Sequence, residues 1–375
     1  MHGFGPHSGG VDRYVTGLVN ALRQAGHATP VCAFVGAPPN TGDDCSLGRA
    51  DQNVLRRLAA IRRFLDRETS RGGNVMASHF SLYGLPARAR RHLPHVVHFH
   101  GPWAMESAAE GQGRLTIWLK RQVELRVYRP ATRCIVLSQA FATILAEQYG
   151  VAREKISIVP GGVDTAHFRP REGRTAARQR LGWPADVPIV FCVRRLARRM
   201  GIEVLLDAFA QVRRQHPRAV LMIGGRGAQA EALAAKARSL GLGDAVRWLG
   251  FVGESDLPLC YEAANLSVVP SQTLEGFGLV AVESLACGTP VLVTPVGGMP
   301  DVVAPLDKGL VLRGTDEVAV ANGLLTALAE PGHLPTGPAC REYAERNFTW
   351  GHVARRVQSV YQEAVDDFAM KGRSG

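Results

Sequence analysis

Two glutamates separated by seven residues flank the most informative segment of the sequence. Residues 271–283 (SQTLEGFGLVAVE) follow a predicted strand and open a predicted helix from about Gly278 to Ala286. A helix start offers free N–H groups and a positive dipole end, which suit a phosphate, and glycines let the backbone approach a ligand closely. Carboxylates accept hydrogen bonds from paired hydroxyls. The segment therefore predicts a site for a ligand with phosphate and hydroxyls, although a capped turn with two surface glutamates has the same spacing.

A second candidate segment is basic. Residues 193–201 (VRRLARRMG) follow the first predicted strand of a second set of α/β units. Guanidinium groups in a strand-to-helix loop form charge-assisted pairs of hydrogen bonds with a pyrophosphate. The alternative is a solvated basic loop.

Histidines form the third candidate group. His98 and His100 alternate along a predicted strand and so share one face. If His98 and His100 bound zinc, the site would need a third ligand, and His79 is the one candidate. We interpret His98 as structural and His100, which precedes Gly101-Pro102 at a strand end, as a functional residue. The glycine-rich turn at residues 224–228 lacks the remainder of a dinucleotide fingerprint.

The elements around these residues alternate between short β-branched runs and amphipathic stretches. This pattern predicts an α/β fold with two doubly wound, Rossmann-like domains facing a central cleft. The polar stretch at residues 169–174 is interpreted as the linker, which gives domains at residues 1–170 and 171–350. Strands are predicted at residues 75–79, 95–100 and 134–138, and then at 188–193, 219–224, 246–250, 266–270 and 291–295. A strand should precede the Gly9-Gly10 turn, so the first strand is either absent or lies upstream of the given start.

Charge is the feature most open to misinterpretation. The 375 residues carry a net charge of +11, and residues 1–170 hold 21 Lys and Arg against 12 Asp and Glu, whereas the remainder holds 23 against 21. In the predicted helix at residues 53–66, Leu55 is expected to face inward and Arg57 outward. Such basic faces are ordinary solvated surfaces or dock on an anionic membrane. They carry few interleaved aromatics, which argues against nucleic acid as a partner.

Compartment and membrane topology follow from absences in the sequence. No apolar run approaches the roughly 20 residues that span a bilayer, and no basic region with an apolar core begins the chain. The seven cysteines are widely spaced and form no C-x-x-C pair. We therefore expect a cytoplasmic protein, with peripheral contact at the inner face of the membrane left open.

Taken together, these segments resemble retaining glycosyltransferases of the GT-B fold, in the large family 4 group. The pair Glu275 and Glu283, in E-x7-E spacing, is the most specific match. The other matches, in chain order, are Gly9-Gly10-Val11, Gly84-Leu85-Pro86, Ser138-Gln139-Ala140-Phe141, residues 159–164, Arg195-Leu196, Arg199-Met200-Gly201, residues 286–291, Gly297-Gly298 and Phe348-Thr349-Trp350. Such enzymes move a sugar from a nucleotide-diphosphate sugar to an acceptor hydroxyl with retention of configuration, usually without a bound metal.

The resemblance implies roles for single residues. Glu283 would hold the ribose hydroxyls, while Glu275 would hold hydroxyls of the donor sugar and His100 would lie near that sugar. Arg195 would neutralise the diphosphate, with Arg199 replacing a lysine that the family places where this chain has Met200. The backbone at Gly9, Gly10, Gly276, Phe277, Gly278 and Leu279 would contact sugar and phosphate. Arg194 stands where the family commonly has glycine.

The implied reaction uses no cofactor and no covalent nucleophile. We expect front-face attack, with the leaving diphosphate accepting the proton of the acceptor hydroxyl. The acceptor is a surface polysaccharide, a lipid-linked saccharide or a small metabolite, bound by the first domain, onto which residues 351–375 return as a helix. Two alternatives remain: a GT-B sugar-nucleotide epimerase, and a basic protein that binds a membrane surface or nucleic acid.

Overall fold

The structure, a computed structural model, describes residues 10–26, 31–34, 45–46, 52–90 and 92–373. Two compact units divide the chain. The first unit combines Met1–Gly162 with Trp350–Gly375, and the second unit is Val163–Thr349. Gly9 and the expected strand before Gly10 lie outside the described residues.

The first unit is built on a four-stranded parallel sheet with the order β3-β4-β5-β6. Its strands are β3 (Met76–Ser78), β4 (His95–Phe99), β5 (Arg133–Val136) and β6 (Ile156–Ile158). A separate parallel pair joins β1 (Ala33–Phe34) to β2 (Cys45–Ser46). The helices are α1 (Gly10–Gln24), α2 (Val54–Ser70), α3 (Ser81–Gly84), α4 (Trp103–Ala109), α5 (Arg114–Tyr128), α6 (Gln139–Tyr149) and α15 (Trp350–Arg373). The strands predicted within this part of the chain are confirmed.

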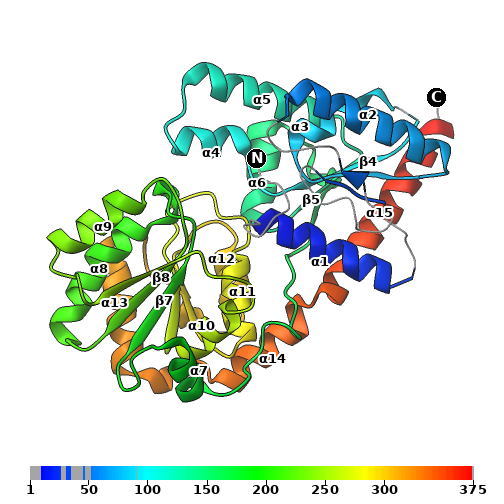
Figure 1. The fold of residues 1–375 in the computed structure, drawn as a ribbon. Helices are drawn as coiled ribbons and strands as arrows, with labels where there is room; N and C mark the ends of the chain where they lie inside the picture. Colours follow the sequence, from blue (N-terminus) through cyan, green and yellow to red (C-terminus); the bar gives the residue numbers. More distant parts are fainter. Residues whose placement is uncertain (1–9, 27–30, 35–44, 47–51, 91, 374–375) are drawn as a thin grey trace. The chain divides into compact units, whose positions relative to one another are not determined.

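Helices cover both faces of this sheet, as continuous apolar parallel strands require. Neighbouring residues of β4 point to opposite cores: Val96 packs with residues of α1 and α15, and Val97 packs with residues of α5 and α6. Helices α1 and α15, which are far apart in the sequence, lie side by side (Figure 1). Trp350 at the start of α15 lies against Gly17 and Gly162, where an added Cβ would come within 2.1 Å and 2.7 Å of its ring.

The second unit is built on a five-stranded parallel sheet with the order β11-β10-β7-β8-β9. Its strands are β7 (Ile189–Val193), β8 (Val220–Gly224), β9 (Val246–Gly250), β10 (Leu266–Val269) and β11 (Val291–Val293). The helices are α7 (Arg174–Leu181), α8 (Ile202–Gln215), α9 (Ala230–Ser239), α10 (Leu257–Ala263), α11 (Leu279–Ala286), α12 (Met299–Val303), α13 (Glu317–Ala329) and α14 (Gly337–Phe348). All five predicted strands are confirmed, and their order is the 3-2-1-4-5 arrangement of a Rossmann-like sheet.

Two interpretations of local sequence are wrong. Residues 169–174 lie inside the second unit, because the carboxylate of Glu262 accepts hydrogen bonds from the backbone N–H groups of Arg171, Glu172 and Gly173 at 2.6–3.0 Å. In α2, Leu55 is 72% exposed, whereas Arg57 is only 1% exposed and donates to the Tyr83 hydroxyl at 2.7 Å. A buried arginine with a phenolic partner has replaced the apolar contact that helical spacing indicated.

No helix in the described part of the chain has the length and the apolar composition needed to cross a membrane. Among the cysteines with described side chains, Cys32, Cys134, Cys192, Cys260, Cys287 and Cys340 are free thiols.

Candidate active site

The strand order of the second unit places its two candidate loops together. Strands β7 and β10 are neighbours at the centre of the sheet, while the connections from them lead outward in opposite directions to β8 and β11. Ligands of doubly wound sheets bind beyond the carboxyl ends of the strands at this reversal. The loop after β7 begins at Arg194 and the loop after β10 begins at Pro270, so both predicted segments lie at the reversal point.

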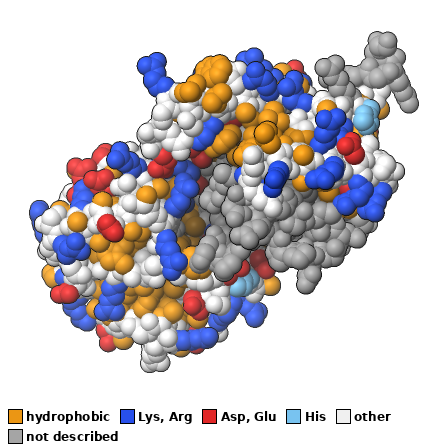
Figure 2. Space-filling model, turned by 45° about the horizontal axis from the view of Figure 1, so that its top comes forward, with side chains coloured by type: hydrophobic (Ala, Val, Ile, Leu, Met, Phe, Trp, Pro, Cys, Tyr) orange, Lys and Arg blue, Asp and Glu red, His pale blue; other side chains and the backbone are white. Residues whose placement is uncertain are grey.

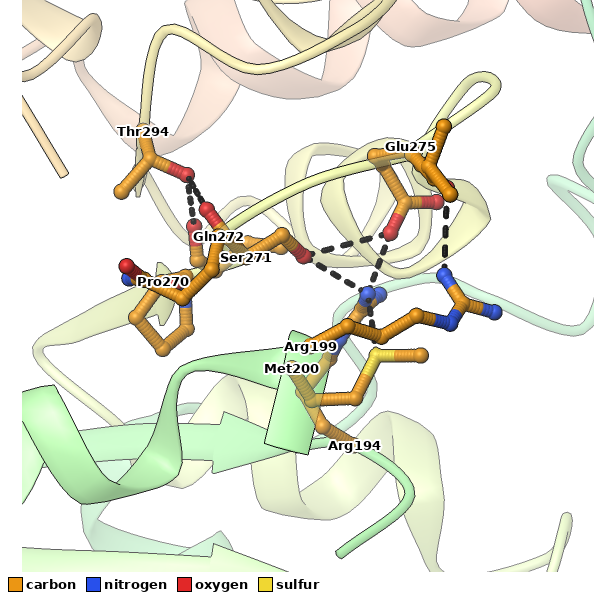
Figure 3. Close-up of polar contacts among 10 residues, drawn as sticks. Arg194, Arg199, Met200, Pro270, Ser271, Gln272, Glu275 and Thr294 are labelled. Atoms are coloured by element: carbon orange, nitrogen blue, oxygen red, sulfur yellow. Dashed lines mark hydrogen bonds and ion pairs between the residues drawn. The ribbon is translucent and has the colours of Figure 1, made fainter. Parts of the chain in front are cut away.

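Hydrogen bonds fix the loop after β10. The Thr294 hydroxyl donates to the Ser271 carbonyl at 2.6 Å, and the Gln272 amide donates to the carbonyls of Pro270 at 3.0 Å and Thr315 at 2.9 Å. The backbone N–H of Gln272 donates to the Arg199 carbonyl at 2.8 Å and so joins the two loops. Figure 3 shows these side chains converging on the loop. A loop with so many fixed backbone groups can hold a catalytic side chain in one position.

Two close backbone approaches and one strained residue shape this loop. Gly201 has φ +73°, and a Cβ on it would lie 1.8 Å from the Pro270 carbonyl oxygen. Gly297 has φ +60°, and a Cβ there would lie 1.7 Å from the carbonyl oxygen of Glu275. Leu274 has φ +54° and is the single non-glycine with positive φ among the residues that the structure describes. Such strain concentrates at functional sites, and here it directly precedes Glu275.

Glu275 forms a buried ion pair with Arg194. One terminal nitrogen of Arg194 donates to Oε2 of Glu275 and, at 2.8 Å, to the hydroxyl of Ser271, which in turn donates to the same Oε2 at 3.2 Å. The side chains of Arg194 and Glu275 are 8% and 14% exposed. Arg199 lies near this pair and donates to the Leu274 carbonyl at 3.1 Å. Figure 3 shows both guanidinium groups beside the carboxyl group.

The environment of Glu275 keeps it ionised. Burial by itself would raise the pKa of the carboxyl group, but the charges of Arg194 and Arg199, with the hydrogen bonds from Arg194 and Ser271, lower the pKa below its ordinary value. Glu275 is therefore an anion at neutral pH and can accept hydrogen bonds but cannot donate a proton.

The helix start that follows fits an anion. Helix α11 begins at Leu279, so the predicted span of Gly278 to Ala286 is confirmed to within one residue. Its N-cap is Gly278, with φ +80° and no capping side chain. Gly276, Phe277 and Gly278 are buried. A helix start carries backbone N–H groups and the positive end of the helix dipole, so the phosphate contact expected from the glycine pattern stays a prediction at this position.

Glu283 lies in the second turn of α11 and is deeply buried. Its Oε2 accepts a hydrogen bond from the Tyr261 hydroxyl at 3.2 Å. The two predicted carboxylates thus occupy distinct positions, Glu283 on α11 and Glu275 in the loop before it. The ribose role of Glu283 stays a prediction.

Arg195, predicted to neutralise the diphosphate, is exposed beside Arg194. Within the described residues its side chain makes no hydrogen bond or ion pair. Its charge is available to a ligand, whereas that of Arg194 is already used by Glu275. Consecutive residues in an extended chain point to opposite sides, which explains why these neighbours differ.

His100 belongs to the first unit, directly after β4. Its Nε2 lies 3.0 Å from Nδ1 of His79, which follows the neighbouring strand β3. Burial lowers the pKa of His100 to about 4. His98 is buried between the hydroxyls of Tyr14 at 3.5 Å and Tyr361 at 2.8 Å, in agreement with a structural role. Gly10, at the exposed start of α1, also belongs to this unit.

Across the residues that the structure describes, no set of three or more His, Cys, Asp or Glu side chains could hold a metal ion. Sequence reasoning missed two residues that the structure brings to the site, Ser271 and Arg194. The departure of Arg194 from the family glycine was the available signal. The partnership of His79 with His100 was considered only as a metal site.

The structure defines an α/β protein with two parallel sheets, and the candidate site lies at the reversal of the second sheet. Comparisons with known proteins narrow this class. The family model described as Glycosyl transferases group 1 matches residues 173–347, and that of Glycosyltransferase Family 4 matches residues 8–167. The chain is 33% identical over 306 residues to a D-inositol 3-phosphate glycosyltransferase of Streptomyces bingchenggensis, which covers 78% of this chain and 67% of that protein.

Solved structures share the fold. A sucrose-phosphate synthase from Thermosynechococcus elongatus has a TM-score of 0.80 and 27% identity, over 95% of this chain and 94% of that one. Anabaena HepE in complex with UDP-glucose has a TM-score of 0.78 and 20% identity, over 96% of this chain and 97% of that one. The chain therefore belongs to the group 1 glycosyl transferases and has the GT-B fold. Neither the epimerase nor the basic-surface binder gains support from these relatives.

Proposed function

We propose that this glycosyltransferase moves a sugar from a nucleotide-diphosphate sugar to an acceptor hydroxyl with retention of anomeric configuration and without a metal. The observation that carries the proposal is the arrangement around β7 and β10. An ionised carboxylate, Glu275, lies beside two arginines and four residues before the start of α11. Such a site suits a ligand with a diphosphate and sugar hydroxyls together. The complex of HepE with UDP-glucose supports UDP-glucose as the first donor to test.

The charges of the site match what bond cleavage requires. As the glycosidic bond breaks, negative charge grows on the leaving diphosphate, and Arg195, Arg199 and the N–H groups of α11 stabilise that charge. The arginines supply the positive charge that a metal supplies in other transferases. Glu275 orients sugar hydroxyls, and the diphosphate takes the acceptor proton on the face from which it leaves. His100, in the first unit, stays neutral at pH 7 because burial lowers its pKa to about 4, so it can act as a hydrogen-bond partner but not as a proton donor of the charged form.

The stereochemistry of the product tests this proposal. We expect binding of at least one donor in a thermal-shift panel of UDP-, GDP-, ADP- and dTDP-sugars, followed by turnover with an acceptor panel that includes D-inositol 3-phosphate. Proton NMR of the product at early times should show the anomeric configuration of the donor. An inverted product, or an epimerised nucleotide sugar formed without acceptor, would contradict the proposal.

We also propose peripheral contact with an anionic membrane, through α5 rather than through the basic helix at residues 53–66. Leu115, Trp118 and Leu119 are 71%, 56% and 51% exposed and share one helical face, because they are three and four residues apart. The exposed Arg114 and Arg121 flank them. Figure 2 shows hydrophobic and basic side chains next to one another at the top of the view. An interfacial helix that binds anionic lipid combines these two kinds of side chain.

A vesicle assay tests this surface. Replacing Leu115 and Trp118 together by serine removes apolar side-chain surface that the membrane would bury. We expect at least a tenfold loss of co-sedimentation with vesicles that contain phosphatidylglycerol. Arg56→Ser together with Arg63→Ser, on the exposed face of α2, is the control and should change binding little. Equal binding by the α5 variant and the unmodified protein would exclude this surface, and equal losses in both variants would indicate charge attraction alone.

A cytoplasmic location, which the free thiols support, would place this surface against the inner leaflet. Contact of the enzyme with the membrane in turn favours a lipid-linked saccharide over a small metabolite as the acceptor.

A further inference from the structure

The loop after β7 contains an arginine that the proposed reaction has not yet used. We propose that Arg194 is a positioning residue for the donor sugar: it binds one oxygen of the Glu275 carboxyl group and thereby presents the other oxygen to a sugar hydroxyl. This inference rests on the proposed function for the identity of the ligand. The contact between the two side chains stands by itself.

The contacts divide the Glu275 carboxyl group into two different oxygens. Oε2 accepts hydrogen bonds from Arg194 and from the Ser271 hydroxyl. Within the described part of the chain no hydrogen bond reaches Oε1. A carboxylate has acceptor capacity on both oxygens, so Oε1 is the atom that can serve a ligand. Figure 3 shows both contacts ending on the same oxygen.

Burial shows that Arg194 is held rather than exposed to solvent. Its side chain is 8% exposed, and one terminal nitrogen contacts Glu275, Ser271 and, at 2.9 Å, the sulfur of Met200. Its Nε atom is buried and makes no hydrogen bond to any residue that the structure describes. A desolvated donor without an acceptor is energetically unfavourable. Burial of the Arg194 guanidinium group is therefore unfavourable at Nε, and the ion pair with Glu275 offsets this.

These contacts assign different tasks to three arginines of one loop. Arg195 is exposed and its charge is available for the diphosphate. Arg199 supports the carbonyl of the strained Leu274 and contributes charge near Glu275. Arg194 donates directly to the carboxylate of Glu275. Replacement of Arg194 should therefore lower kcat through poorer positioning of the donor sugar, while leaving the affinity for the nucleotide diphosphate largely unchanged.

The electrostatic consequence can be measured at Glu275 itself. The charged and polar groups around this carboxyl group are Arg194, Arg199 and Ser271. An opposite charge within about 4–6 Å lowers a carboxyl pKa by about 1–3 units. Arg194→Met removes the nearer charge at similar length, so the carboxyl group of Glu275 should titrate at higher pH. If activity requires the ionised form of Glu275, the acid limb of the pH–activity profile should then move to higher pH.

The experiment compares Arg194→Met and Arg194→Lys with Arg198→Met as the matched control, because Arg198 is an exposed arginine of the same loop. Carbon-13 NMR of glutamate-labelled protein follows the titration of Glu275, assigned with Glu275→Gln. For Arg194→Met we expect an upward shift of at least about one pH unit in this titration and in the acid limb of kcat/KM for UDP-glucose. At pH 7, kcat should fall at least tenfold, with Kd for UDP within about threefold of the unmodified protein.

The other variants separate the outcomes. Arg194→Lys keeps the charge without the planar contacts and should lie between the unmodified protein and Arg194→Met, which also preserves the test if the methionine variant does not fold. Arg198→Met should behave as the unmodified protein. An unmoved Glu275 titration, or a tenfold weaker Kd for UDP with an unmoved acid limb, would overturn the positioning role. If the unmodified protein turns over no nucleotide sugar, the proposed function fails, while the NMR titration still decides whether Arg194 controls Glu275.

Discussion

Replacing Arg195 and Arg199 together by alanine is expected to weaken UDP binding by about 100-fold or more. Hydrogen bonds to charged groups contribute about 1.5–3 kcal/mol each, so the loss of two guanidinium groups amounts to about 3–6 kcal/mol. Each 1.4 kcal/mol is a factor of ten in affinity. Arg195 is exposed, and Arg199 lies in the loop that contacts Leu274. Calorimetric titration with UDP measures the effect directly, and turnover should fall at least as far.

A control must separate a specific site from general loss of positive charge. Arg198→Ala together with Arg214→Ala removes two exposed arginines, one from the same loop and one from α8. That variant should bind UDP within about threefold of the unmodified protein. Thermal unfolding of both double variants is needed because Arg199 also supports the Leu274 carbonyl. Tight UDP binding by Arg195→Ala/Arg199→Ala would show that the diphosphate binds elsewhere.

The sequence was sufficient for the strands of the second unit, because four of the five, β7, β8, β10 and β11, are mostly apolar and buried. Strands buried on both faces leave the same signal at every position, and residues 188–193 and 266–270 are of this kind. The helix start at Gly278 was also predictable, since glycine before an apolar helix has few other uses. The position of the site at the reversal of the sheet then follows from the order of the strands alone.

Side-chain contacts in loops could not be predicted in this way, because no periodicity governs them. Arg194 and Arg195 are adjacent and chemically identical, yet one is buried against Glu275 and the other is exposed. The polar composition of residues 169–174 indicated a linker, and only the structure shows a single carboxylate, that of Glu262, binding three of its N–H groups. Arg57 is the same case in a helix, where a buried guanidinium group that donates to the Tyr83 hydroxyl departs from the hydrophobic pattern.

Glu275→Gln is expected to lower kcat by about 100-fold or more while UDP binding changes by less than about threefold. The amide is nearly isosteric, but it removes the negative charge that balances Arg194 and Arg199 and weakens the acceptor at Oε1. Groups that stabilise a transition state contribute about 10²–10³ in kcat when one is removed. Turnover of UDP-glucose and calorimetry with UDP provide the two measurements, both on the same preparation.

Substitution of the second glutamate, Glu283, provides a comparison for the Glu275 variant. Glu283 is buried on α11, where its carboxyl group accepts a hydrogen bond from the Tyr261 hydroxyl at 3.2 Å. If it holds the ribose, Glu283→Gln should weaken UDP binding about tenfold and change kcat at saturating donor much less, because hydroxyl contacts of the nucleotide are the same before and during bond cleavage. Glu275→Gln should therefore change mainly kcat, whereas Glu283→Gln should change mainly the affinity for UDP. Small and equal effects would remove both assignments, and a mass-spectrometric glycosyl adduct on Glu275 would replace front-face attack with a covalent route.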